Sequence, residues 1–210
     1  MALFRLAIEE RHPGVDRYRK PGTFAHTADA ASAQLNKPMN VRDFYQLLAP
    51  IVDTLDCGHS ELALPKTYSK YLQQKAKQLP FRFQLNDTGL FVRVSYAGDS
   101  VQLMNMRVEK INGYNVDSLA QSWNAHMTSD GYNETMKQLC VGRYFREEFA
   151  AFVGEPDTFL MQLRNRNTTG PGNDSVLIIR GKTKTFAQLD SIYKSRYEKL
   201  GTPKPLQLLL

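Results

Sequence analysis

The amino-acid sequence predicts an α+β protein: a small all-helical N-terminal domain, residues 1–78, followed by an α+β domain, residues 80–200. Two changes along the chain lead to this prediction. Apolar residues between 40 and 57 recur with the helical period of 3.6, whereas from Phe81 onward they alternate with the period of two that is typical of strands. Pro80 separates the two patterns and marks the predicted boundary. A length of 210 residues suits one large domain or two small ones.

The strongest helical pattern begins at Asn40, a residue type that caps helix N-termini well. The apolar residues after it share one face of a helix. Pro50 lacks a backbone donor and predicts a kink, and Cys57-Gly58 is expected to end the helix, with Gly58 as its left-handed C-terminal residue. His59 then leaves the helix end on a tight turn. The apolar positions of that face are Phe44, Leu48, Ile51, Val52 and Leu55.

Turn and capping residues place the remaining elements. Asn112-Gly113 is a turn signal, Asn133 is expected to cap the longest helix, and Gly154 is expected to end it. Segment 165–174 is rich in Asn, Thr, Gly and Pro, as is typical of a long hairpin loop. The expected helices are 3–10, 23–35, 66–78, 116–128, 134–153 and 186–200, and the expected strands are 81–85, 90–96, 107–111, 158–164 and 175–180.

The net charge of +6 is carried by the two ends of the chain. Residues 1–80 contribute +3, residues 81–180 contribute −1, and the last 30 residues contribute +4. Nucleic-acid-binding proteins usually concentrate Lys and Arg on one face or in one run, together with aromatic residues. The basic residues here are dispersed, so the sequence predicts no nucleic-acid partner.

The two cysteines, Cys57 and Cys140, form no CxxC pair, and the spacing therefore gives no support for a zinc site or for dithiol redox chemistry. A disulfide between them is geometrically possible. Free Cys behaves as a small hydrophobic residue, so two buried free thiols are the expected state.

Four histidines are candidates for proton transfer or metal binding: His12, His26, His59 and His126. None belongs to an HExxH or similar motif, so no metal site and no cofactor are predicted. His59 differs from the others because it follows Gly58 on a short turn, where a general base can be both accessible and restrained. The alternative is that His59 is a structural turn residue.

No nucleophile motif accompanies these histidines. The patterns GxSxG, SxxK and Cys-His-Asn are absent, and Gly170-Pro171-Gly172 lacks the Lys-Ser/Thr that follows in a phosphate-binding loop. No run approaches about 18 apolar residues, so no membrane span is predicted. The first ten residues turn acidic and show no signal peptide.

Four short segments occur in an order that is found in a known family. They are residues 9–14 (EERHPG), 44–52 (FYQLLAPIV), 57–60 (CGHS) and 108–113 (VEKING). Together they resemble the N-terminal half of the tricorn-type, C-terminal-processing serine peptidases, especially the secreted forms of Bacteroidetes-like bacteria. The resemblance covers most of residues 5–160.

The resemblance implies a helical domain that ends in a Gly-His-Ser/Thr turn, then a PDZ-like peptide-binding domain, and then a catalytic serine domain. It makes His59 the general base toward that serine. Strand 89–97 and helix 116–128 would take the extended end of a peptide between them by strand addition. Helix 134–153 is an extra element relative to a minimal PDZ domain. The peptide-binding residues implied are Gly89, Leu90, Phe91 and Val92.

Because no nucleophile motif is present, the resemblance implies a non-catalytic N-terminal fragment of a secreted serine peptidase, inactive by itself. Residues 201–210 would be a tail or a linker to the missing catalytic domain. The implied partners are that domain and a polypeptide substrate or protein C-terminus, in the periplasm or at the cell surface after removal of a signal peptide. The alternative is a stand-alone peptide- or protein-binding module with no enzymatic role.

Overall fold

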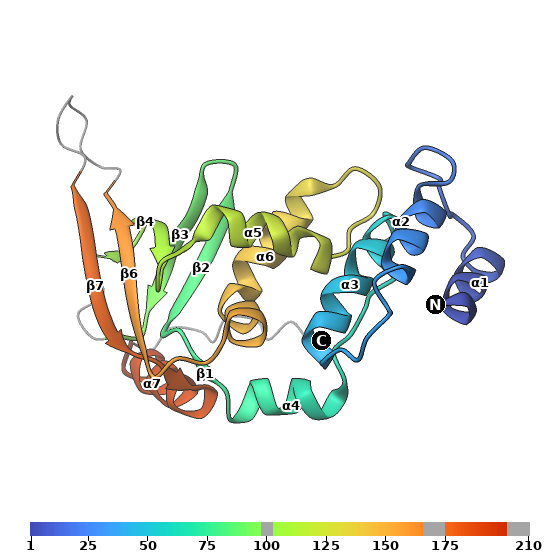
Figure 1. Cartoon of the computed structure of the whole chain (residues 1–210). Helices are drawn as coiled ribbons and strands as arrows, with labels where there is room; N and C mark the ends of the chain where they lie inside the picture. The colour runs from blue at the N-terminus through green and yellow to red at the C-terminus, as the bar shows by residue number, and fades with distance from the viewer. Residues whose placement is uncertain (98–102, 166–174, 201–210) are drawn as a thin grey trace.

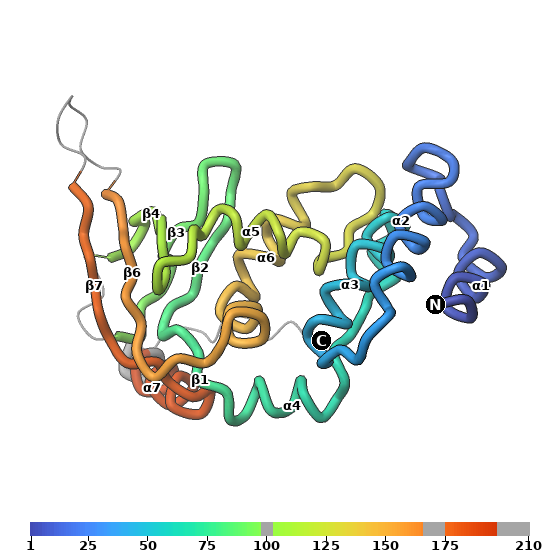
Figure 2. The backbone as a smooth tube through the Cα atoms, in the orientation of Figure 1, coloured from blue at the N-terminus to red at the C-terminus, as the bar shows by residue number. Residues whose placement is uncertain are grey.

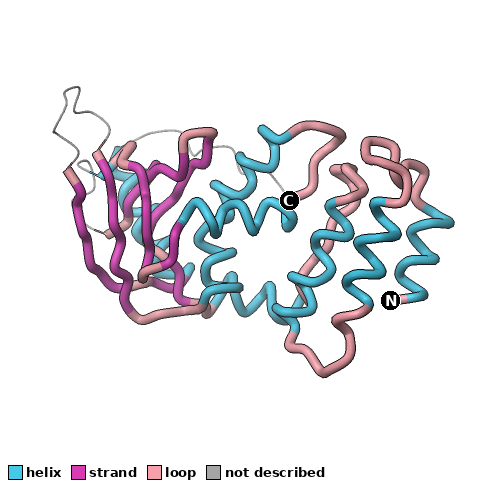
Figure 3. The backbone as a smooth tube through the Cα atoms, turned by 45° about the horizontal axis from the view of Figure 1, so that its top comes forward, coloured by secondary structure: helices cyan, strands magenta, loops and turns pink. Residues whose placement is uncertain are grey.

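The computed structural model describes residues 1–97, 103–165 and 175–200 (Figure 1). The tail 201–210 and all but the first residue of the predicted loop 165–174 lie outside this part of the chain. The described residues form helices together with a mostly antiparallel sheet, which confirms the predicted α+β class. The strands gather at one end of the molecule, and the other end is entirely helical (Figure 3).

The N-terminal helices pack through an apolar cluster in which Phe24 and Ala28 of α2 meet Ile51 of α3. Asn40 caps α3 as predicted, since its side-chain oxygen accepts the Asp43 N–H at 2.9 Å. This end of the molecule consists of α1 (Ala2–Arg11), α2 (Thr23–Ser32) and α3 (Val41–Asp53), after which α4 (Lys66–Gln74) leads toward the sheet (Figure 1).

The main sheet has the strand order β2-β3-β4-β6-β7, with the short β5 paired to β4, and every described pairing in it is antiparallel. Asn112 and Gly113 both have positive φ, 50° and 85°, and form the predicted turn between β4 and β5. The strands are β2 (Phe81–Asn86), β3 (Gly89–Ser95), β4 (Arg107–Ile111), β5 (Tyr114–Asn115), β6 (Thr158–Arg164) and β7 (Val176–Lys182).

Aromatic side chains from α5, α6 and the strands meet in the main core. Trp123 of α5 and Phe83 of β2 both pack edge-on against Phe145 of α6, with ring centroids 5.0 and 5.2 Å away. Gly142 lets α6 approach β2 closely, because a Cβ at this position would overlap the backbone nitrogen of Leu85. These helices are α5 (Val116–Trp123), continued by the 3₁₀ turn η2 (Asn124–His126), and α6 (Glu134–Glu148), continued by the π-helical turn η3 (Phe149–Val153).

A two-strand ribbon joins the middle of the chain to its last described helix. Strand β1 (Lys77–Gln78) pairs antiparallel with β8 (Lys184–Thr185), and α7 (Phe186–Leu200) follows. The tube in Figure 2 shows β1 and α7 side by side at the base of the sheet. No helix of the described chain is both long and apolar enough to cross a membrane.

Three local predictions are corrected by the structure. Helix α3 ends at Asp53 rather than at Cys57, and Asp56, with φ 43°, takes the left-handed conformation that was expected of Gly58. The helix expected over 66–78 ends at Gln74, because residues 77–78 pair with β8. Phe44, expected on the buried face of α3, is 44% exposed.

Candidate functional site

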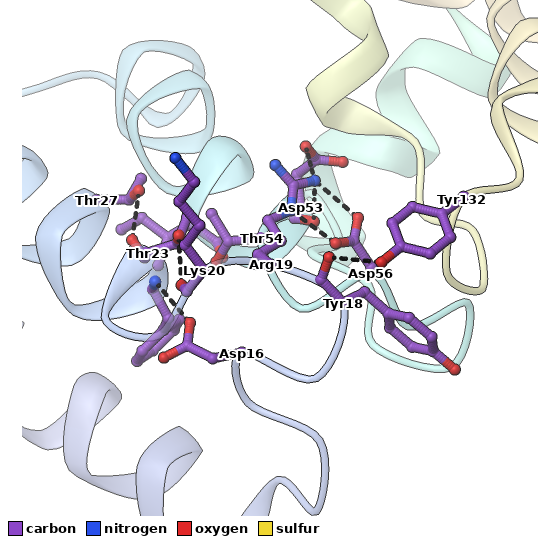
Figure 4. Close-up of polar contacts among 12 residues, drawn as sticks. Asp16, Tyr18, Arg19, Lys20, Thr23, Thr27, Asp53, Thr54, Asp56 and Tyr132 are labelled. Atoms are coloured by element: carbon purple, nitrogen blue, oxygen red, sulfur yellow. Dashed lines mark hydrogen bonds and ion pairs between the residues drawn. The ribbon is translucent and has the colours of Figure 1, made fainter.

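Arg19 holds the chain segment that follows α3 (Figure 4). Its Nε and Nη2 donate to the two carboxylate oxygens of Asp56 at 2.6 and 2.7 Å, and Nη2 also reaches the backbone oxygen of Asp53 at 3.1 Å. Paired hydrogen bonds between a guanidinium and a carboxylate are geometrically specific. This contact fixes the side chain of Asp56 at the end of α3, where Asp56 has the left-handed backbone.

The next residues form the tight turn that carries His59. The Ser60 N–H donates to the Cys57 oxygen at 3.1 Å, and the His59 side chain is 90% exposed. The Gly58 N–H donates to Asp130 Oδ1 at 2.8 Å, and His59 Nδ1 lies 4.0 Å from the same oxygen. The absence of a side chain on Gly58 matters here, because a Cβ would lie 3.2 Å from that carboxylate oxygen.

The loop that carries Asp130 is tied to the same turn by two further contacts. The Gly131 N–H donates to the backbone oxygen of Asp56 at 2.8 Å. The Tyr132 hydroxyl donates to the Tyr18 oxygen at 3.1 Å (Figure 4). The His59 turn and the Asp130 loop, which are distant in sequence, are therefore held together by hydrogen bonds.

A cavity of about 1020 Å³ opens beside this turn, between the N-terminal helices and the α+β part. Gly58, His59 and Asp130 line it together with residues from α4 and α6. Its wall also includes Gln78 and Ser129, each of which has a solvent-inaccessible side-chain oxygen without a hydrogen-bond partner among the described residues. A concave site with a few convergent polar groups is typical of ligand binding.

A buried polar pair lies deeper in the same cavity wall. His126 Nδ1 is 2.7 Å from Glu148 Oε2, and the His126 side chain is only 4% exposed. The ring packs against Tyr45 and Phe152, with centroids 5.1 and 4.7 Å away. Burial raises the pKa of Tyr45, and the charges of Glu148 and Glu61 raise it further. The sequence does not reveal this partner of His126, because Glu148 is 22 positions away.

The predicted peptide-binding residues lie inside the sheet. All four residues of 89–92 are buried in β3, which pairs with β2 on one side. On the other side Leu90 and Phe91 pair with β4, and Val92 exchanges backbone hydrogen bonds with Met106 and Asn105. Strand addition needs a strand edge with free backbone groups, and the backbone of Leu90, Phe91 and Val92 is paired on both sides, so addition of a peptide here would require one of these pairings to open.

The two cysteines are free, as predicted, and half-buried. Burial raises the pKa of the Cys140 thiol. Cys57 contributes to a mixed group of side chains, because its Sγ, a ring nitrogen of His59 and a carboxylate oxygen of Asp130 all lie within 4.8 Å of one another. In the described chain this is the group that could hold a metal ion.

Comparison with known proteins gives similarity at the level of the fold. No family model and no curated protein matches the sequence. Among solved structures, mature CPAF aligns with a TM-score of 0.52, and mature CPAF complexed with lactacystin aligns with a TM-score of 0.55. Each is 12% identical to this chain, and each alignment covers 87% of it and 33% of the CPAF chain.

The S499A mutant of CPAF aligns in the same way, with a TM-score of 0.51, 12% identity, and coverage of 87% of this chain and 32% of that chain. The chain therefore spans about a third of the length of the structures it matches. The likeness is one of fold: most of this chain shares its fold with part of CPAF.

Proposed function

We propose that the chain is part of a secreted serine peptidase of the tricorn or C-terminal-processing type, in which it supplies the general base and part of the substrate site. The serine nucleophile would come from another domain of the same peptidase. The observation that carries this proposal is the position of His59, which is 90% exposed on a restrained turn at the rim of a large cavity. The fold shared with part of CPAF is consistent with it.

In this proposal His59 accepts the proton of the serine hydroxyl while the serine oxygen attacks the peptide carbonyl. The imidazolium then returns the proton to the leaving amine, as a general base of this kind does in acyl transfer. Asp130 Oδ1 lies 4.0 Å from His59 Nδ1. The Gly58 N–H keeps the Asp130 carboxylate beside the ring.

The substrate would lie in the cavity of about 1020 Å³ rather than on strand β3. The cavity is large enough for several side chains of a peptide, and polar residues such as His59, Glu61 and Asp130 line it. A periplasmic or cell-surface location belongs to the same proposal, through the resemblance to secreted peptidases, as does a PDZ-like role for the α+β part.

The test is the hydrolysis of casein and of a fluorogenic peptide by the peptidase that contains this chain. His59→Ala should lower kcat by about 10³-fold or more, because a missing base collapses the triad, while His26→Ala, which alters another exposed histidine, should leave kcat unchanged. The 210-residue chain by itself should show no turnover. Near-normal turnover of the His59→Ala variant would contradict the catalytic assignment and favour a binding module.

A further inference from the structure

We infer that Cys57, His59 and Asp130 form a binding site for a zinc-like divalent cation. Each residue offers one ligand atom, and the three atoms lie within 4.8 Å of one another. This inference depends on the geometry of the three side chains and is independent of the peptidase proposal.

The chemistry of the three ligands selects the class of metal. Thiolate sulfur, imidazole nitrogen and carboxylate oxygen are the three ligand types that zinc accepts in proteins, whereas calcium and magnesium require oxygen ligands. In a tetrahedral zinc site neighbouring ligand atoms are roughly 3.5 Å apart, so the atoms of this group need to approach by about 1 Å. The side chains of His59 and Asp130 are 90% and 71% exposed, and they can rotate to close that distance.

The backbone around the group is already arranged for metal binding. The Gly58 N–H donates to Asp130 Oδ1 at 2.8 Å and restrains the carboxylate beside the turn that carries Cys57 and His59. Hydrogen bonds of this kind to a metal-binding carboxylate are typical of the groups that surround metal sites. The Gly131 N–H donates to the backbone oxygen of Asp56 at 2.8 Å, and this hydrogen bond keeps the Asp130 loop against the Cys57–His59 turn.

Three protein ligands leave one position of a tetrahedral site for water or another ligand. Both His59 and Asp130 line the cavity of about 1020 Å³, so that position is accessible from it. On binding, the Cys57 thiol releases its proton to solvent and a metal–sulfur bond forms. A metal-bound ring nitrogen of His59 cannot also accept a proton, so metal occupancy would block a general-base role of that nitrogen.

Cobalt is a suitable probe, because a cobalt–thiolate bond gives a near-ultraviolet charge-transfer band. The 210-residue chain, treated with a chelator and kept reduced with a phosphine, is titrated with Co²⁺ and followed by absorption. We expect a thiolate band that saturates at one Co²⁺ per chain and disappears when Zn²⁺ is added, as the order of affinities for such ligands requires. Cys57→Ser should abolish the band, and His59→Ala and Asp130→Asn should each raise Kd at least about tenfold.

The second cysteine provides the matched control. Cys140→Ser removes a half-buried thiol outside the group, and His26→Ala removes an exposed histidine outside it, so both variants should bind Co²⁺ like the unaltered chain. Circular dichroism checks that each variant is folded. The inference is overturned if the unaltered chain gives no thiolate band, if the band persists in folded Cys57→Ser, or if it is lost from folded Cys140→Ser. None of these outcomes depends on hydrolysis, so the peptidase proposal stands or falls separately.

Discussion

Lys137 of α6 lies with its Nζ 2.5 Å from Oδ1 of Asp53, the last residue of α3. The Lys137 side chain is 5% exposed and that of Asp53 is 16% exposed, so the ion pair is largely shielded from water. Asp53 Oδ2 also forms an ion pair with Arg19 Nη2, at 3.2 Å. The ion pair joins α6, which packs against the sheet, to α3, which precedes the His59 turn. Because both helices contribute residues to the cavity wall, the pair helps to position that wall.

We expect Lys137→Ala to lower the free energy of unfolding by about 3 kcal/mol. Removing one partner of a buried ion pair leaves the other charge buried, and here Arg19 compensates Asp53 only in part. Urea denaturation followed by circular dichroism measures the change. Lys70→Ala, an exposed position on α4, should change stability by less than about 0.5 kcal/mol, and an equal effect of the two substitutions would contradict the role of the ion pair.

The two histidines that line the cavity should differ sharply in their effect on stability. His126→Ala leaves Glu148 without its 2.7 Å partner and removes packing against two aromatic rings, so a loss of about 2 kcal/mol is expected. His59→Ala removes a side chain that is 90% exposed and should cost less than about 0.5 kcal/mol. Thermal unfolding of the two variants side by side tests this; a large destabilisation by His59→Ala would show that its turn has a structural role.

Gly142→Ala should destabilise the protein by about 3 kcal/mol or more, because overpacking at rigid backbone displaces whole elements. The added methyl group would meet the backbone of Leu85 and Gln84, so α6 must move away from β2. At Gly14 the nearest atoms to an added methyl group are 3.6 Å away, and Gly14→Ala should be nearly neutral. Chemical denaturation of both variants gives the comparison, and similar stabilities would argue against the close approach of α6.

Stability should fall in acid partly through Glu109. Hydrogen bonds from Arg164 and Gln162 and the nearby positive charges lower the pKa of Glu109 below its usual value. A carboxyl group with a lowered folded-state pKa contributes stability above its unfolded pKa, about 4.3, and loses that contribution as the pH falls through its folded pKa. Glu109→Gln should therefore be less stable than the unaltered chain at pH 7 and nearly equal to it at pH 2. Denaturation curves across this range measure the difference, which must shrink, not grow, with acidification.

Helix bounds and caps that depend on residues close in the sequence are predicted well. The last helix has the predicted bounds, 186–200, and Asn40 and Asn133 cap α3 and α6 through their side chains. Apolar periodicity and capping are local properties, so a single sequence reveals them. Contacts with distant partners are not visible in this way: the left-handed residue after α3 is Asp56, which Arg19 contacts from 37 positions away, rather than the predicted Gly58.

In the candidate site, too, features set by neighbouring residues are predictable from the sequence, and contacts between distant residues are not. His59 is recognisable because the residues that form its turn are adjacent in sequence. Asp130 is not recognisable from the sequence, because it is 72 positions away from Gly58, to which it is hydrogen-bonded. The pairing of His126 with Glu148 is not recognisable either. The pairing of residues 89–92 is hidden from the sequence for a related reason. Their apolar character identifies a strand, but only the order of the sheet shows that both edges of that strand are occupied.

The short ribbon between β1 and β8 has a consequence for the order of folding. Lys77 pairs with Thr185, so β1 has no partner until nearly all of the described chain has been synthesised. Pairing across such a long loop carries a large closure entropy, and contacts of this kind tend to form late. The helices α1 to α3 have a core cluster of their own and can pack early. The cavity beside His59, which includes Gln78 of β1 and Phe186 of α7 in its wall, would then be completed in the last step of folding.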